Sequence, residues 1–364
     1  MQFRDLHRQY LAMKDEIDEA ISSVVVSGSF IMGSVVETLE KELADYVGVK
    51  HCITCANGTD AMLLALTAWE IGPGDAVFLP DFTFFATAEV VARVGATPVF
   101  VDVEEHTFNI DPSDLYLKFA SVVSQGRLRP AAVIAVDLFG RPAPFPLLSA
   151  FCKEHGMRLL EDGAQGFGGR VGEKRACSFG DISTTSFFPA KPLGCYGDGG
   201  AIFTDSDEWA AVLRSLRLHG KGSDKYDNVR IGFNSRLDAL QAAILRVKLR
   251  HFDDELQAVG RVASRYNELL KNKVAIPQID ADMLSSWAQY TVRSDNRDLL
   301  RSRLQAKGIP SMVYYPRPMS RQTAFATLGQ SVCPVADQLS RQVLSLPMHP
   351  YLTEEEMISV TCDL

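Results

Sequence analysis

The chain has 364 residues, enough for two domains of ordinary size, and its 46% hydrophobic and 23% charged content is typical of a globular protein with a large core. Its formal net charge of −8 argues against general binding to nucleic-acid backbones, which requires a basic face. The sequence has no predominantly apolar segment of about 20 residues, as a membrane span requires, and no signal-peptide pattern at its start, so we expect a cytoplasmic protein.

Short apolar runs alternate with helical patterns from about residue 50 to residue 205. The runs, which we expect to be strands, are residues 51–55, 76–80, 97–102, 131–137, 158–162 and 201–205. Continuous apolar strands that alternate with helices are typical of a mainly parallel sheet covered on both faces. The sequence therefore predicts an α/β fold for this part of the chain.

The cysteines raise the question of a metal or redox site. There are seven, an odd number without a disulfide framework, which favours a reducing compartment. Cys52 and Cys55 have the C-x-x-C spacing of some zinc and redox sites. Because they lie three residues apart in an expected strand, their side chains should point to opposite faces. We therefore expect two buried thiols and no metal site.

The pattern changes after residue 205. A long helix without internal proline is predicted from about Ser235 to Lys271. Beyond it, residues 289–294, 308–316 and 345–350 look like short strands separated by helices. We predict a large domain with the N-terminal helices over residues 1–250, and a smaller α+β domain over residues 251–364.

Three segments with chemically useful residues follow expected strands, where open α/β sheets bind ligands. Residues 56–60, Ala-Asn-Gly-Thr-Asp, precede a helix and suit a phosphate, although they also fit an ordinary capped turn. Asp162 can reach a ligand or cap a turn. Lys191, in SFFPAKPLGCYGDGG, has apolar and small neighbours and no evident partner, and the prolines and glycines around it predict a fixed, non-helical loop.

Together these segments suit a ligand with a phosphate, a group that pairs with a carboxylate, and a carbonyl that reacts with an amine. Pyridoxal phosphate (PLP) has all three. An apolar setting lowers the pKa of a lysine, so that the free amine of Lys191 is available to form a Schiff base. A carboxylate such as Asp162 at the ring nitrogen keeps that nitrogen protonated and makes the ring an electron sink.

Nearly the whole chain resembles the DegT/StrS family of PLP-dependent sugar aminotransferases, which have the fold-type-I architecture. The resemblance rests on the motifs FRDLHRQY, ANGTDA, DFTFFATA, EDGAQGFG, SFFPAKPLGCYGDGGAIFT, GFNSRLDALQAAIL, VYYPRP and SLPMHPYL. It is strongest for the branch that aminates C3 of UDP-2-acetamido-2-deoxy-3-oxo-glucuronate with L-glutamate as donor. A lysine in the central motif favours transamination, because some family members have a histidine there and act as dehydratases.

The resemblance implies a role for individual residues around the cofactor. Lys191 forms the Schiff base and then moves protons as acid and base. Asp162 pairs with the pyridinium nitrogen, and Gln165 lies near the phenolic oxygen. Phe84 stacks on the ring, with Phe82 as the alternative.

The resemblance also implies how the phosphate and the substrate are bound. Gly58, Thr59 and Ser186 hold the phosphate, and Asn234 reaches it from a neighbouring subunit, which makes the active site part of a homodimer. The residues expected at the nucleotide sugar are Arg236, Tyr314 and Tyr315, with an interface arginine and two core tyrosines as the alternative. The family often has His-Tyr-Pro at positions 314–316 and His or Asn at position 320, where this chain has Tyr-Tyr-Pro and Ser.

Other classes of protein fit less well. A nicotinamide-binding oxidoreductase needs G-x-G-x-x-G between a strand and a helix, and a P-loop NTPase needs G-x-x-x-x-G-K-[ST]; neither pattern occurs. A regulatory protein that retains the fold is an alternative without catalysis, but it would be expected to lose Lys191 or Asp162. Among enzymes, the sequence leaves open the nucleotide, amination at C3 or C4, and a carboxylate or methyl group at C6.

Overall fold

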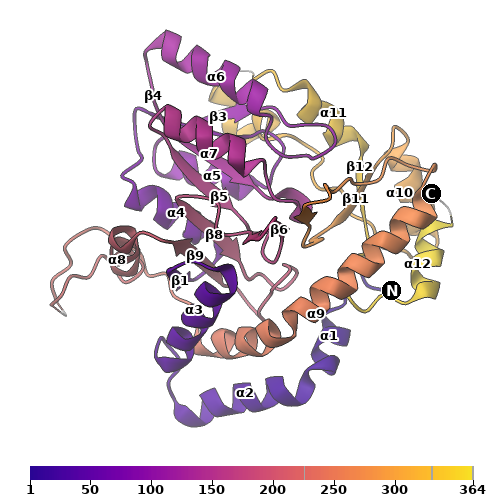
Figure 1. Cartoon of the computed structure of the whole chain (residues 1–364), viewed down its shortest axis with the longest axis horizontal. Coiled ribbons are helices and arrows are strands. Elements are labelled where there is room, and N and C mark those ends of the chain that lie inside the picture. Colours follow the sequence, from indigo (N-terminus) through magenta and orange to yellow (C-terminus); the bar gives the residue numbers. More distant parts are fainter. Residues whose placement is uncertain (225, 329–330, 363–364) are drawn as a thin grey trace.

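Figure 1 shows the computed structural model of the chain, which describes residues 1–224, 226–328 and 331–362. Among these residues the central sheet has seven strands in the order β1-β9-β8-β5-β4-β2-β3. Its strands are β1 (His51–Cys55), β2 (Asp75–Pro80), β3 (Thr97–Val101), β4 (Arg129–Val136), β5 (Arg158–Asp162), β8 (Ile182–Ser186) and β9 (Gly200–Thr204). Only the pairs that involve β9 are antiparallel, so the predicted mainly parallel sheet is confirmed.

The six predicted strands of this sheet are present, with ends that lie within two residues of the predicted ones, but β8 was not predicted. Its sequence, ISTTS, has no apolar run. In the structure the Ser183 hydroxyl donates to Glu161 Oε2 at 2.7 Å, and the Thr185 hydroxyl donates to the carbonyl oxygen of Gly163 at 3.1 Å. A polar strand can lie at the centre of a sheet when its hydroxyls have such partners.

Helices cover both faces of the sheet. On one face, Val77 and Ile134 lie in a core with α4 (Gly58–Ala68) and α5 (Phe85–Arg93). On the other face, Phe78 and Val133 pack with α6 (Pro112–Gln125) and α7 (Phe145–Glu154), and near β1 and β9 this face is covered by α3 (Ser34–Val47). The predicted two-sided covering is therefore confirmed.

The two cysteines of the C-x-x-C pair belong to different cores. Cys52 packs in the core that includes α3, and Cys55 packs in the core that includes α4. Both side chains are buried, and burial raises the pKa of both thiols. The prediction of two buried thiols on opposite faces of a strand is confirmed.

The long helix α9 (Ala239–Leu270) confirms the prediction for residues 235–271 within four residues at its start and one at its end. Figure 1 shows α9 crossing the molecule from the region of α3 to the region of α12 (Glu354–Thr361). Side chains of its first half, such as Phe252, pack in the core with α3. Side chains of its second half, such as Tyr266, pack in a second core.

The second core surrounds a two-stranded antiparallel sheet of β11 (Tyr290–Arg293) and β12 (Val343–Leu346), with α10 (Arg297–Ala306) and α12 beside it. β11 lies within the predicted strand 289–294, and β12 overlaps the predicted strand 345–350 in part. The strand predicted over residues 308–316 is wrong, because only Met312 forms an isolated bridge, to Ser345. The rest of that segment is irregular, and it carries Tyr314 and Tyr315 away from the small sheet.

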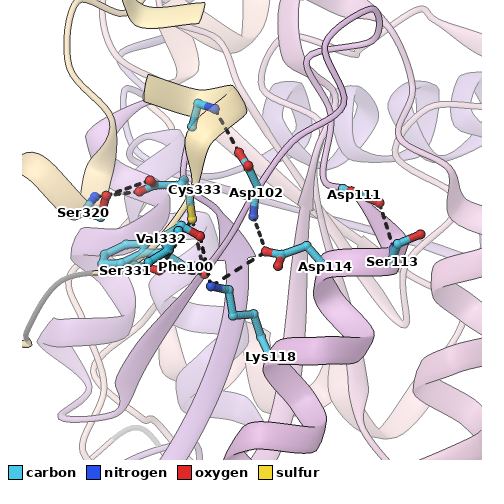
Figure 2. Close-up of polar contacts among 12 residues, drawn as sticks. Phe100, Asp102, Asp111, Ser113, Asp114, Lys118, Ser320, Ser331, Val332 and Cys333 are labelled. Carbon is cyan, nitrogen blue, oxygen red and sulfur yellow. Dashed lines mark hydrogen bonds and ion pairs between the residues drawn. The ribbon is translucent and has the colours of Figure 1, made fainter. Parts of the chain in front are cut away.

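The segment after these tyrosines is fastened to the large sheet. Asp102, just after β3, accepts hydrogen bonds from the backbone N–H groups of Val335 and Ala336 at the start of α11 (Pro334–Gln342), each at 2.9 Å. Figure 2 shows Asp102 between this segment and α6. Asp81, just after β2, accepts from the hydroxyl of Ser320 at 2.7 Å. These contacts hold the C-terminal segment at the carboxyl ends of β2 and β3.

The remaining elements are short or N-terminal. They are α1 (Leu6–Ala12), α2 (Lys14–Ser27), α8 (Asp207–Leu216), β6 (Arg170–Val171), β7 (Lys174–Arg175), β10 (Met283–Leu284) and the 3-10 turns η1 (Leu138–Gly140), η2 (Met319–Arg321) and η3 (Thr323–Leu328). The predicted domain boundary between residues 250 and 251 falls inside α9, and it stays a prediction. Among the described residues, no helix combines the length and the apolar character needed to cross a membrane.

Candidate active site

The candidate site lies at the carboxyl ends of β1, β5 and β8. Asp162 is the last residue of β5, and Ser186 is the last residue of β8. Gly58 begins α4 shortly after β1, and a Cβ atom added to Gly58 would lie only 2.7 Å from the Cβ atom of Ser186. The absence of a side chain at position 58 therefore lets the start of α4 contact the end of β8.

The start of α4 presents unused hydrogen-bond donors. Asn57 is its N-cap, and the side-chain oxygen of Asn57 accepts from the backbone N–H of Asp60 at 2.8 Å. The N–H groups of Gly58 and Thr59 lie in the first turn, where no intrahelical acceptor is available. Together with the Ser186 hydroxyl and the positive end of the helix dipole, they can bind a phosphate.

Asp162 and Lys191 form the charged pair of the site. The Asp162 carboxylate is buried and accepts a hydrogen bond from the Thr87 hydroxyl at 3.0 Å. Burial raises the pKa of Asp162, and the attraction of the Lys191 charge opposes that rise. Burial lowers the pKa of Lys191, and the attraction of Asp162 opposes that fall. The two groups are therefore close enough to interact, and the lysine has an increased share of the neutral, nucleophilic form.

Lys191 lies in a closed, non-helical loop, as predicted. The backbone N–H of Cys195 donates to the carbonyl oxygen of Phe187 at 2.8 Å and closes the loop around the lysine. On the far side, Lys248 of α9 is 1% exposed and donates from Nζ to the carbonyl oxygen of Gly194 at 2.7 Å. The Lys191 side chain itself makes no hydrogen bond to another described residue, which leaves its amine available for a ligand.

Gln165 and Tyr315 meet beside this pair. The Gln165 side-chain oxygen accepts from the backbone N–H of Phe139 at 2.7 Å, which leaves its amide nitrogen to donate to the Tyr315 hydroxyl at 3.2 Å. Burial raises the pKa of Tyr315, so its hydroxyl stays protonated. The contact joins the end of β5 to the irregular segment that precedes η2.

The two candidate stacking residues have different surroundings. Phe82 is 1% exposed, and its ring packs edge-on against Phe139 and Tyr315 in the core. Phe84 is 54% exposed, and its ring centroid lies 6.1 Å from that of Tyr315. Only Phe84 of these two therefore has a ring face available to a ligand.

Three predicted residues lie farther from the charged pair. Asn234 is exposed, and it directly precedes Ser235, whose hydroxyl donates to Asp60 of α4 at 2.7 Å. Arg236 is partly buried and forms no hydrogen bond or ion pair with any described residue. Tyr314 is partly buried and packs edge-on against Phe3, with ring centroids 6.2 Å apart. No direct contact joins these side chains to Lys191 within the described part of this chain.

Two residues of the site were not predicted. Thr87 contacts Asp162 from a position 75 residues earlier in the sequence, and it looks like an ordinary helix residue. Lys248 lies among apolar residues in the segment ILRVKL, and a charge on an apolar helix face is the signal that could have drawn attention to it. Both residues hold the charged pair in place.

The geometry tests whether these residues fit PLP. An amine with a lowered pKa interacts with the charge of a buried carboxylate at the end of β5, and the start of α4 contacts the end of β8, the strand next to β5. The residue types match the aldehyde, the ring nitrogen and the phosphate of PLP, so the site fits the cofactor. A mainly parallel sheet with this set of residues defines the class of PLP enzymes of fold type I.

Comparisons with known proteins identify the family within that class. The model of the DegT/DnrJ/EryC1/StrS aminotransferase family matches residues 11–364. The UDP-2-acetamido-2-deoxy-3-oxo-D-glucuronate aminotransferase of Pseudomonas aeruginosa is 45% identical over 100% of this chain and 98% of its own length. The chain belongs to the DegT/DnrJ/EryC1/StrS aminotransferase family, as the sequence motifs predicted.

Solved structures agree with this assignment. A DegT/DnrJ/EryC1/StrS aminotransferase from Brucella abortus is 49% identical, with a TM-score of 0.97 over 100% of this chain and 98% of that one. A Bacillus subtilis relative, 27% identical with a TM-score of 0.87 over 97% of this chain and 81% of that one, contains bound PMP, the amino form of the cofactor. The predicted fold type and the PLP dependence are therefore confirmed.

Proposed function

We propose that the chain moves the amino group of L-glutamate to C3 of a UDP-linked 3-keto sugar, UDP-2-acetamido-2-deoxy-3-oxo-glucuronate. The observation that carries this proposal is the pair of Lys191 and Asp162 in a protein 45% identical to an aminotransferase for that sugar. Arg236 and Arg317, which is exposed, are the cations available to a C6 carboxylate of the sugar. The product would serve cell-surface polysaccharide synthesis, such as that of the O-antigen of lipopolysaccharide, in the cytoplasm.

The residues near the start of α4 hold the cofactor in this proposal. The N–H groups of Gly58 and Thr59 and the hydroxyl of Ser186 bind the phosphate, and Asp162 pairs with the ring nitrogen. When bound, PLP supplies an electron sink that stabilises negative charge next to the transferred nitrogen. Asp162 remains ionised against its burial because the ring nitrogen carries a proton, and the Thr87 hydroxyl fixes the orientation of the carboxylate.

Other residues of the site orient the ring and the substrate. Phe84 stacks on the ring, since its face is exposed and that of Phe82 is not. Gln165 lies at the phenolic oxygen, with its amide orientation set by Phe139. Tyr314 and Tyr315 lie on the nucleotide-sugar side, together with Arg236.

Lys191 is the proton carrier of both half-reactions. Its neutral amine takes the proton from Cα of glutamate in the first half, in which glutamate leaves as 2-oxoglutarate. In the second half, Lys191 delivers a proton to C3 of the sugar or withdraws it in the reverse direction. The closed loop and the Lys248 contact keep the amine at one place during these transfers.

A homodimer with shared active sites is part of the proposal. Large apolar side chains are exposed on the segment after α2 and on the segment before Asn234, among them Phe30 at 45% and Ile231 at 93%. A second copy of the chain would cover such side chains. It would also place Asn234 at the phosphate of the neighbouring subunit, where its amide donates a hydrogen bond.

Mixed dimers test the role of Asn234. The Asn234→Ala homodimer is expected to bind PLP about 10- to 100-fold more weakly, because a hydrogen bond to a charged group is lost. When Asn234→Ala and Lys191→Ala subunits are combined and assayed at limiting PLP, roughly a quarter of the sites regain both residues if Asn234 acts across the interface. Activity that does not exceed the sum of the separate variants would show that Asn234 serves its own subunit or no site.

The substrate proposal is tested with half-reactions. The purified, PLP-loaded protein is expected to be yellow, to lose its visible band on addition of L-glutamate, and to carry the label on Lys191 after borohydride reduction. The glutamate-treated protein is then mixed with a panel of UDP- and dTDP-linked 3-keto and 4-keto sugars, with carboxylate or methyl groups at C6. Recovery of the band with the UDP-3-keto-glucuronate supports the proposal, and recovery only with a 6-deoxy sugar would replace it. A colourless protein that takes up no PLP would favour the regulatory alternative.

A further inference from the structure

The N-terminal segment reaches the loop that carries Lys191. Arg4 donates from Nη2 to the carbonyl oxygen of Lys191 at 2.9 Å and to that of Pro192 at 3.2 Å, across 187 residues of sequence. The same segment is attached to the second core, because the carbonyl oxygen of Phe3 accepts from the backbone N–H of Met348 at 3.0 Å. The guanidinium is therefore held against the lysine loop from outside the large sheet.

The positive charge of Arg4 is not neutralised by an ion pair within the described residues. Its hydrogen bonds within the described residues are to carbonyl oxygens, and the carboxylate that attracts it, Glu255, accepts hydrogen bonds from Gln9 and Tyr351. Burial lowers the pKa of Arg4, as expected for a cation with incomplete compensation. An arginine remains charged nevertheless, so a fixed positive charge lies beside Lys191.

Burial and two charged side chains, those of Asp162 and Arg4, influence the pKa of the Lys191 amine. Burial is the main cause that lowers its pKa; Asp162, on β5, attracts the ammonium and raises it, and Arg4 repels the ammonium and lowers it further. Burial also raises the pKa of Tyr314 and Tyr315, so these phenols stay neutral and add no charge. The charge of Arg4 therefore acts on the pKa of Lys191 in the opposite direction to the charge of Asp162.

We propose that Arg4 is a positioning residue for Lys191: it fixes the lysine loop through two carbonyl oxygens, and its charge, held beside that loop, adds to the effect of burial in favouring the neutral amine. This inference rests on the proposed function, in which the neutral amine of Lys191 is the proton carrier. It assigns to the N-terminal segment, outside the sheet that carries the other site residues, a direct part in setting the state of that amine.

Lys248 provides a matched comparison. It also binds a carbonyl oxygen of the same loop, that of Gly194, but it is not among the groups whose charge acts on the Lys191 amine. Replacing Arg4 thus removes a contact with the lysine loop and a charge that acts on the Lys191 amine. Replacing Lys248 removes a contact with the loop but no charge that acts on that amine. Arg4→Lys keeps the charge, but its shorter side chain cannot place the nitrogen where Nη2 of Arg4 contacts both carbonyl oxygens.

The test measures the protonation of the lysine without turnover. Full-length protein freed of cofactor is labelled with acetic anhydride at a series of pH values, and acetylation at Lys191 is quantified by mass spectrometry. The pH dependence of the visible band is recorded in parallel for the PLP-loaded protein. We expect both curves of Arg4→Met to shift to higher pH, while those of Arg4→Lys and Lys248→Met stay near the wild-type position.

Kinetic measurements distinguish the anchoring of the lysine loop by Arg4 from the effect of the Arg4 charge on the amine. Arg4→Met and Arg4→Lys are both expected to lower kcat, by up to about 10²-fold, because the amine is displaced, with little change in KM for glutamate. Wild-type curves for Arg4→Met, or an equal shift in Lys248→Met, would overturn the proposal. If the pH curves of Arg4→Met shift but the wild-type protein aminates no keto sugar, the proposed function would be wrong. The effect of Arg4 on the Lys191 amine would still be supported. Lys14→Met, on the exposed face of α2, serves as the control for charge removal elsewhere.

Discussion

Lys191→Ala is expected to bind PLP but to lose turnover by at least about 10⁴-fold, because the variant lacks the group that we propose moves the proton in both half-reactions. The change leaves the proposed phosphate donors at Gly58, Thr59 and Ser186 in place, so the variant should retain the cofactor. The measurement is the single-turnover rate of amino transfer from glutamate, with bound PLP quantified in the same sample. Borohydride reduction should no longer attach the cofactor to the chain.

The experiment has a control variant, and one outcome would contradict the role assigned to Lys191. Lys14→Ala removes an exposed lysine of α2 that pairs with Asp18 and lies over the Tyr10 ring, and it should leave the rate unchanged. Partial recovery of Lys191→Ala by an added small amine would support the role of the side chain as a base. If Lys191→Ala retained an appreciable rate without such an amine, another residue would have to carry the proton, and the assignment would be wrong.

Asp162→Asn is expected to reduce kcat/KM by about 10²- to 10³-fold, since it removes the negative charge that we propose pairs with the ring nitrogen. The substitution keeps the shape of the side chain and its contact with Thr87. The structure places this carboxylate in a buried setting that raises its pKa, with Lys191 opposing the rise. The neutral amide cannot stabilise a proton on the ring nitrogen, so we expect slower removal of the proton from glutamate. The measurement is the rate at which the visible band is lost on addition of glutamate.

Thr87→Val provides the graded comparison for Asp162. It has a similar volume but cannot donate to the carboxylate, and the loss of one hydrogen bond to a charged group predicts a decrease of about 10-fold or somewhat more. The order wild type, Thr87→Val, Asp162→Asn is the expected order of decreasing rate. Equal rates for wild type and Asp162→Asn, with normal PLP content, would rule out the proposed pairing.

The strands of the large sheet were predictable because most of them are apolar runs, and β8 shows the limit of that signal. Its Ser and Thr side chains look like a loop in the sequence, and only the partners on β5 and in the turn after it make them compatible with a buried strand. The segment 308–316 shows the opposite error. Its apolar residues look like a strand, but Ile309 packs in the second core and only Met312 pairs with the small sheet.

In the site, the sequence indicated the residues to which we assign the chemistry, but it did not indicate the residues that contact them from other elements. Lys191 stands out because a lysine among apolar residues is unusual, and Asp162, which could equally cap a turn, was singled out by its place at a strand end and by the family motif around it. Phe82 and Phe84 are equivalent in the sequence, and their exposures of 1% and 54% distinguish them. Arg4 contacts the lysine loop across 187 residues, a tertiary contact that local sequence patterns do not encode.

The 32 residues of α9, a rod of about 48 Å, supply side chains to two cores. Unfolding of either core would expose apolar side chains of α9, so heating should unfold both cores in one cooperative transition. Because α9 itself connects the two cores within the described residues, we expect any closing of the protein around its substrate to come from tilting of α9 or from movement of the loops beside it.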